Sequence, residues 1–117
     1  MNPSVTLTVL VTLIFALLGA AKILALPRMR ELATEAGFSV DAYRRIGVLE
    51  VAGAIGVALG PALPPLGVLA AAGLLALLAG AIATHLRHRD GIREIAPALV
   101  CALLVAGYLA ALIRAGA

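Results

Sequence analysis

Residues 5–26 read VTLTVLVTLIFALLGAAKILAL, a long apolar run in which Lys22 is the only charged side chain. An α-helix needs about 20 such residues to cross the hydrocarbon core of a membrane. Three more runs of this kind follow along the chain, at residues 46–63, 66–85 and 95–113. The sequence therefore predicts an all-α integral membrane protein, a bundle of four helices that each span the bilayer.

The overall composition points the same way. The 117 residues are 63% hydrophobic and 13% charged, whereas soluble domains are usually about 45–50% apolar and about 25% charged. The mean hydropathy is +1.12 and the sequence pI is about 9.8. The basic residues stand in short loops beside the apolar runs, which does not suit nucleic-acid binding. We expect one membrane domain over residues 1–117, with the lipid bilayer as a partner and no nucleic acid.

The basic residues are spread unevenly over the loops, and this predicts the orientation. The turn at residues 60–65 has no charge, and Arg114 stands alone near the last residues. The linkers after the first and third runs carry the other arginines: Arg28, Arg30, Arg44 and Arg45, then Arg87, Arg89 and Arg93. Cytoplasmic loops are enriched in Lys and Arg. We expect both linkers in the cytoplasm and both termini outside.

The first linker has a helical pattern of its own. Pro27 is suited to begin a short helix and Gly37 to end it. Between them, four apolar residues recur at helical spacing: Met29, Leu32, Ala33 and Ala36. We expect a short amphipathic helix in the membrane interface between spans 1 and 2. Ser39 is expected to cap the helix that leads into the second span.

Small residues recur at four-residue spacing in every run, and such faces let helix backbones approach closely in lipid. The four sets are Thr8, Thr12, Ala16 and Ala20; Gly53, Gly56 and Gly60; Ala72, Ala76, Gly80 and Thr84; Ala98, Ala102, Ala106 and Ala110. We expect at least two of these faces to form helix contacts.

Three ionisable residues, Lys22, Glu50 and His85, stand near the ends of the first three runs. Charges in such runs are costly unless they have a partner or a function. If the runs cross the membrane in order, all three lie at the same mouth of the bundle. Lys22 can neutralise Glu50, and His85 can donate a hydrogen bond to Glu50 or stand alone. Arg45 is a further candidate partner for Glu50, although a separation of five positions fits a helix poorly.

Two interpretations of this cluster remain open. It can be a structural staple that ties the first two helices together, or a polar site that binds a head group or moves a proton. In the second case Lys22, Glu50, His85 and Arg45 are the candidate ligand-binding residues. Lys22, Glu50 and His85 are also candidates for acid–base catalysis, because a buried carboxyl beside a lysine and an imidazole can exchange protons. A quinone or another lipid is the ligand that this chemistry suits.

The sequence lacks the motifs of several other chemistries. His85 and His88 have no cysteine or acidic set that would complete a metal site, so we expect no metal. There is no GxSxG motif, no phosphate-binding loop and no CxxC pair, and Cys101 is the single cysteine. A small multidrug transporter would need a carboxylate in the first span, which has none. No cofactor is evident.

Three motifs carry a resemblance to a known family. Gly19 and Lys22 stand near the end of the first run, residues 44–53 read RRIGVLEVAG, and residues 81–87 read AIATHLR. With these motifs the chain resembles the DoxX-like family of small four-span bacterial membrane proteins, over about residues 10–112. The resemblance implies a four-helix membrane bundle. The family's founding member is similar in name to a subunit of a thiosulfate:quinone oxidoreductase, and relatives act as accessory or assembly factors.

We therefore favour an accessory or ligand-binding subunit with a polar Lys/Glu/His cluster at the cytoplasmic mouth of the bundle. The alternative is a small membrane enzyme, or a quinone-linked oxidoreductase subunit, that uses the same cluster for acid–base chemistry. A non-catalytic role is the preferred one of the two. Such a role is compatible with two kinds of protein partner, a second copy of this chain in a homo-oligomer or a membrane redox protein.

Overall fold

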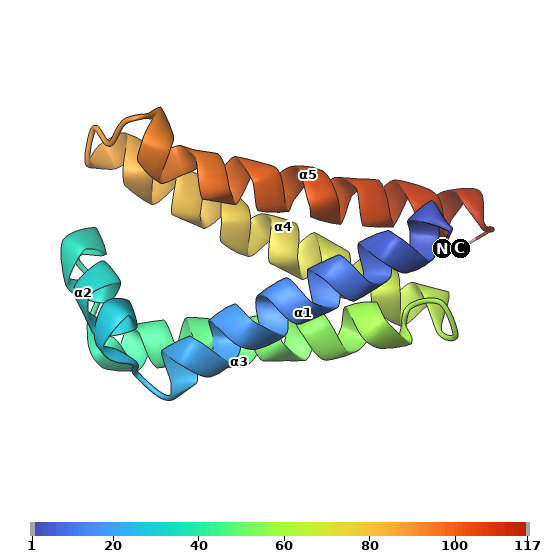
Figure 1. The fold of residues 1–117 in the computed structure, drawn as a ribbon, viewed down its shortest axis with the longest axis horizontal. Helices are drawn as coiled ribbons and strands as arrows, with labels where there is room; N and C mark the ends of the chain where they lie inside the picture. The colour runs from blue at the N-terminus through green and yellow to red at the C-terminus, as the bar shows by residue number, and fades with distance from the viewer. Residues whose placement is uncertain (1, 117) are drawn as a thin grey trace.

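The structure, a computed structural model, describes residues 2–116 and contains helices and turns over that range. The helices are α1 (Pro3–Ile23), α2 (Pro27–Ala36), α3 (Val40–Leu59), α4 (Pro64–Arg87) and α5 (Ile92–Arg114). Figure 1 shows α1, α3, α4 and α5 along the length of the molecule, while α2 lies across one end. The predicted all-α class is confirmed.

Local sequence signals account for several helix ends. The side chain of Asn2 caps α1 by accepting hydrogen bonds from two backbone N–H groups of the first turn. Ser39 caps α3 as predicted, because its hydroxyl accepts from the backbone N–H of Ala42 at 3.0 Å. Pro27 is the first residue of α2, and Gly37 ends it with a φ of 80°, a left-handed conformation that favours glycine. The predicted short helix after the first span is therefore present.

The prediction of four spanning helices holds for three. By length and composition, α1, α4 and α5 are able to cross a membrane, and their ends lie within three residues of those predicted. The helix of the predicted span at residues 46–63 begins after the Ser39 cap as expected, but α3 ends at Leu59, four residues before the predicted end of the span. Four charged residues belong to α3: Asp41, Arg44, Arg45 and Glu50. Its apolar part, residues 46–59, covers only about 21 Å of a core about 30 Å thick.

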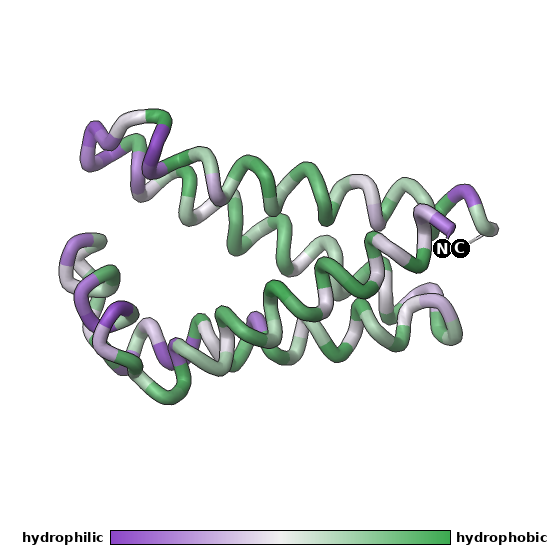
Figure 2. The backbone as a smooth tube through the Cα atoms, in the orientation of Figure 1, coloured by the Kyte–Doolittle hydropathy of each residue, from purple (hydrophilic) through white to green (hydrophobic). Residues whose placement is uncertain are grey.

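The four long helices form a ring in which α1 packs on α3 and α5, and α4 packs on the same two helices. The α1/α3 pair and the α4/α5 pair come together where both termini lie and diverge toward the other end (Figure 1). We call the first the terminal end; it includes the α3–α4 turn, residues 60–63. The second is the charged end, with α2 and the α4–α5 turn, residues 88–91. Figure 2 shows hydrophilic residues gathered at the charged end and apolar residues along the helices.

The apolar core is built from all four long helices. Its most deeply buried side chains are Val11, Phe15, Val57, Ala71, Leu74 and Val105. Large side chains such as Leu17, Leu69 and Leu103 are exposed on the outer faces instead. Outward leucines are expected of helices surrounded by lipid, since lipid tails solvate them.

Glycines on α3 set the distance to α4. A Cβ atom placed on Gly53 would lie 2.6 Å from Leu74 Cδ2, and one placed on Gly56 would lie 2.6 Å from the Cβ of Ala70. Just after α3, a Cβ atom placed on Gly60 would collide with the hydroxyl oxygen of Tyr108 on α5. The small-residue face predicted on α3 is thus buried throughout, and it allows the close approach of α3 and α4.

The small-residue face predicted on α4 is not a helix contact among the described residues. Ala72, Ala76 and Gly80 are exposed, and a Cβ on Gly80 would meet nothing within 4 Å. The side chains that α4 buries are those of another face: Gly67, Ala71, Leu74 and Leu78. One of the expected faces is therefore confirmed, and the α4 face is wrong.

Candidate functional site

The most buried charges of the molecule form one ion pair between α1 and α3. Lys22 Nζ lies 2.6 Å from Glu50 Oε1, and the two side chains are 11% and 7% exposed. Each charge needs the other, because an isolated charge removed from water is costly. The structure thus joins the two residues that the sequence placed at similar depth.

A pair of glycines brings α1 and α3 close enough for this contact. Gly19 stands three residues before Lys22, and Gly47 stands three residues before Glu50. A Cβ on Gly19 would lie 2.7 Å from the carbonyl oxygen of Gly47, and a Cβ on Gly47 would lie 2.7 Å from that of Gly19. Both positions therefore require glycine for the backbones to cross at this distance.

The direction of the two side chains follows from helix geometry. Every Cα–Cβ bond tilts toward the N-terminus of its own helix. Because α1 and α3 run in opposite directions (Figure 1), the side chains of Lys22 and Glu50 lean toward one another. The two charges can therefore meet even though each lies beyond the glycine crossing on its own helix.

Tyr43 completes the site on the side toward α2, and the sequence analysis missed it. Lys22 Nζ lies 5.3 Å from the centroid of the Tyr43 ring, within the range of a cation–π contact. Burial raises the pKa of the Tyr43 phenol above its usual 10.0, so the ring is neutral at physiological pH. Tyr43, Gly47 and Glu50 are spaced by four and three residues. That spacing, which places them on one helix face, is the signal that could have found Tyr43.

His85 does not join this pair. Its Nδ1 atom lies 2.7 Å from Asp90 Oδ2, across the α4–α5 turn, and both side chains are about one-third exposed. The hydrogen bond from His85 to Glu50, one of the two alternatives for this residue, is absent among the described residues, because the α4/α5 pair diverges from α1 and α3 at this end (Figure 1). The predicted cluster of three residues is therefore an ion pair and a separate His–Asp contact.

Arg45 is also apart from the ion pair. It is exposed on α3, and within residues 2–116 it forms no salt bridge, so Glu50 is paired by Lys22. The reason is the one that made the spacing unfavourable: residues five apart on a helix point in different directions.

Cys101 lies on the inner face of α5, beside the buried Ala98 and Val105, and packs against the apolar core. Glu50 is likewise one of the buried residues of α3. The carboxylate of the ion pair therefore lies within the bundle and not on its outer surface.

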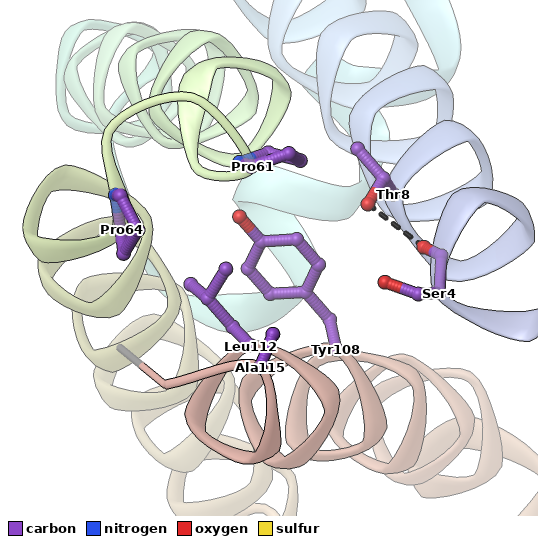
Figure 3. Close-up of a pocket in the computed structure, with 7 residues that line it drawn as sticks. All are labelled: Ser4, Thr8, Pro61, Pro64, Tyr108, Leu112 and Ala115. Atoms are coloured by element: carbon purple, nitrogen blue, oxygen red, sulfur yellow. Dashed lines mark hydrogen bonds between the residues drawn. The ribbon is translucent and has the colours of Figure 1, made fainter.

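The terminal end has a cavity of about 150 Å³, and Figure 3 shows the residues around it. The Tyr108 hydroxyl donates to the carbonyl oxygen of Val57 at 2.8 Å. That carbonyl would normally accept from the residue four positions on, which is Pro61 and has no N–H. The Thr8 hydroxyl likewise donates to the carbonyl oxygen of Ser4 at 2.9 Å. The Tyr108 hydroxyl therefore completes the end of α3, and the Thr8 hydroxyl bonds within α1.

The described residues hold no group of three or more His, Cys, Asp or Glu side chains that could bind a metal ion. The Lys22–Glu50 pair offers a carboxylate but no second metal ligand, and its lysine would repel a cation. The chemistry that the site supports is hydrogen bonding and proton exchange at an ammonium and a carboxylate.

The fold and the ion pair together define a small helical membrane protein with a polar site near one end of its bundle. The comparison with family models identifies it more closely. The model of the DoxX-like family matches residues 6–107, and the chain belongs to this family. The resemblance noted in the sequence is thereby confirmed. No curated protein and no solved structure matches the chain.

Proposed function

We propose that this DoxX-like protein is a ligand-binding or accessory membrane subunit that takes up a lipophilic molecule beside the Lys22–Glu50 pair. The observation that carries the proposal is the burial of this pair between α1 and α3. Ionisable residues inside membrane helices are costly and most often belong to functional sites.

A purely structural role for the pair has less support. The Gly19–Gly47 crossing already holds α1 against α3 through close backbone contact. Replacing a buried ion pair by apolar side chains is often neutral or stabilising. A staple between these helices therefore has little need of two charges, and a binding role gives them a purpose.

The catalytic alternative, acid–base chemistry by Lys22, Glu50 and His85 in a membrane enzyme or a quinone-linked subunit, is supported less well. It needs three groups at one substrate, whereas His85 is engaged by Asp90. A quinone remains one of the lipophilic ligands that the binding proposal includes.

We also propose that the charged end lies in the cytoplasm of a bacterial cell, with both termini outside the inner membrane. The support is the arginine content of α2, of the start of α3 and of the α4–α5 turn. Loops with an excess of Lys and Arg remain on the cytoplasmic side during insertion.

The test is native mass spectrometry of the full chain released gently from its own membranes. The wild type is compared with Glu50→Gln, which removes the charge of the carboxylate and keeps its shape. Glu31→Gln is the matched control, because Glu31 belongs to an exposed ion pair with Arg28. We expect a bound lipid, quinone or protein partner on the wild type and on the control, and its loss from Glu50→Gln. The same bare protein in all three samples would contradict the proposal.

A further inference from the structure

The two charges of the candidate site cancel, but their hydrogen-bonding capacity is not used up. From this we infer that the ligand of the Lys22–Glu50 pair is an uncharged lipophilic alcohol, whose hydroxyl bridges the ammonium and the carboxylate. The inference rests on the proposed binding function and specifies the class of ligand.

The first argument is the charge of the site. Lys22 and Glu50 contribute one positive and one negative charge, and they are in direct contact. Tyr43, which lies beside the ammonium, adds no charge of its own. A charged head group would leave one net charge in a site that is mostly shielded from water, which is unfavourable. A neutral head group avoids this cost.

The second argument is the count of donors and acceptors. An ammonium has three N–H donors and a carboxylate has two acceptor oxygens. Within residues 2–116, the one hydrogen bond of this pair runs from Lys22 Nζ to Glu50 Oε1, so Oε2 accepts none. Nor is Oε2 enclosed by the protein, since the enclosed side-chain polar atom without a partner is Thr12 Oγ1. Oε2 thus keeps some accessible surface and the capacity to accept a further hydrogen bond.

A hydroxyl group matches what is left over. It donates one hydrogen bond, which suits Glu50 Oε2, and it accepts from a second N–H of Lys22. A ketone could accept from Lys22 but would leave Oε2 without a donor. The side chains beside the pair at the glycine crossing, Val51 and Ile23, are apolar, which suits a lipophilic molecule better than a hydrophilic one.

The experiment uses the full-length protein in nanodiscs of zwitterionic phospholipid and four probes that share one long alkyl chain. The probes end in a primary alcohol, a carboxylic acid, a primary amine or a methyl ketone. Native mass spectrometry measures the bound fraction of each at equal concentration in the lipid. We expect the alcohol to bind about tenfold more tightly than the other three, since one hydrogen bond of about 1.4 kcal/mol is worth that factor.

Substitutions of Lys22 and of Glu50 should change the relative affinities of the four probes in opposite directions. Glu50→Gln leaves the positive charge of Lys22 and is expected to favour the acid, while Lys22→Met is expected to favour the amine. The double variant Lys22→Met/Glu50→Leu has neither charge and should bind all four probes alike. It also covers the case in which a single variant fails to fold. Glu31→Gln should keep the order of the wild type.

The outcomes separate this inference from the function on which it rests. Preference of the wild type for the acid or the amine would overturn the neutral ligand and leave the binding function standing. A ketone bound as tightly as the alcohol would overturn the bridging hydroxyl. Equal binding of every probe to the wild type and to the double variant would overturn the binding function as well.

Discussion

The helices contact one another through different kinds of residue at the two ends of the bundle. At the terminal end, Gly60, Gly67 and Tyr108 meet in a close contact, and the tyrosine hydroxyl satisfies a carbonyl of α3. At the charged end the helix pairs diverge (Figure 1), and Lys22 and Glu50 meet with hydrogen-bonding capacity to spare. At the terminal end small residues let the helices pack closely, whereas near the charged end an ion pair is buried between α1 and α3.

The difference teaches where function can be placed in so small a membrane protein. Polar groups whose hydrogen bonds are satisfied within the protein stabilise the fold and have little capacity left to bind a ligand. Polar groups that are buried, charged and only partly satisfied cost stability and remain available for binding. By this criterion the charged end is the functional one and the terminal end is the structural one.

The largest effect should come from breaking the ion pair on one side only. Lys22→Met leaves the buried Glu50 carboxylate without its partner, and we expect the free energy of unfolding to fall by about 3–5 kcal/mol. Unfolding in mixed detergent micelles, followed by far-UV circular dichroism, measures this. The double variant Lys22→Met/Glu50→Leu should recover most of the loss. A single variant as stable as the wild type would mean that water already solvates the carboxylate.

At the terminal end, Gly60→Ala should be the most damaging substitution. The added Cβ would collide with the Tyr108 hydroxyl and would lie 3.0 Å from the Cα of Gly67, a backbone atom that cannot move away easily. We expect a loss of about 3 kcal/mol in the same unfolding measurement. Gly80→Ala is the matched control, because nothing lies within 4 Å of its Cβ position. It should stabilise α4 by about 0.5–1 kcal/mol through helix propensity, and equal effects of the two would refute the close contact.

Tyr108→Phe should have a moderate effect at the same end. The ring still fills its place, but the carbonyl of Val57 loses the tyrosine hydroxyl as a donor, and Pro61 cannot replace it. A buried polar group left without a partner costs about 1–3 kcal/mol, and we expect the lower part of this range, since the backbone N–H of Gly60 also reaches that carbonyl. Chemical unfolding measures the loss, and the ligand bound at the charged end should be unaffected. Loss of that ligand would show that the two ends are coupled.

The smallest effect is expected at His85. Its contact with Asp90 is about one-third exposed, and ion pairs open to solvent contribute about 0–1 kcal/mol. His85→Asn should therefore change the unfolding free energy by less than about 1 kcal/mol and leave ligand binding intact in native mass spectrometry. Loss of the ligand in this variant would return His85 to the site, as the sequence alone suggested.

Much of the fold could be predicted because it depends on neighbours in the chain. The apolar runs indicated the long helices, Pro27 and Gly37 marked α2, and Ser39 marked the start of α3. The second span, residues 46–63, was overestimated because apolar residues of the α3–α4 turn continue the run beyond Leu59. Hydropathy does not distinguish an apolar turn from the end of a helix.

The candidate site could be predicted only in part. Lys22 and Glu50 were found because charges in apolar runs require partners, and the two lay at similar depth. Tyr43 was missed because it lies in the part of α3 before the predicted span. His85 was assigned to the pair because order along the membrane places it at the same end, but sequence order says nothing of lateral distance.

The sequence by itself determined the membrane environment, the helical class, the family motifs and the charges at one end, because these are properties of composition and local spacing. Tertiary structure decided which small-residue face of α4 is buried, that His85 bonds to Asp90, and that Tyr108 satisfies the carbonyl of Val57. These depend on the rotation of each helix about its own axis and on the divergence of two helix pairs. Both result from packing among residues far apart in the chain, which no local pattern records.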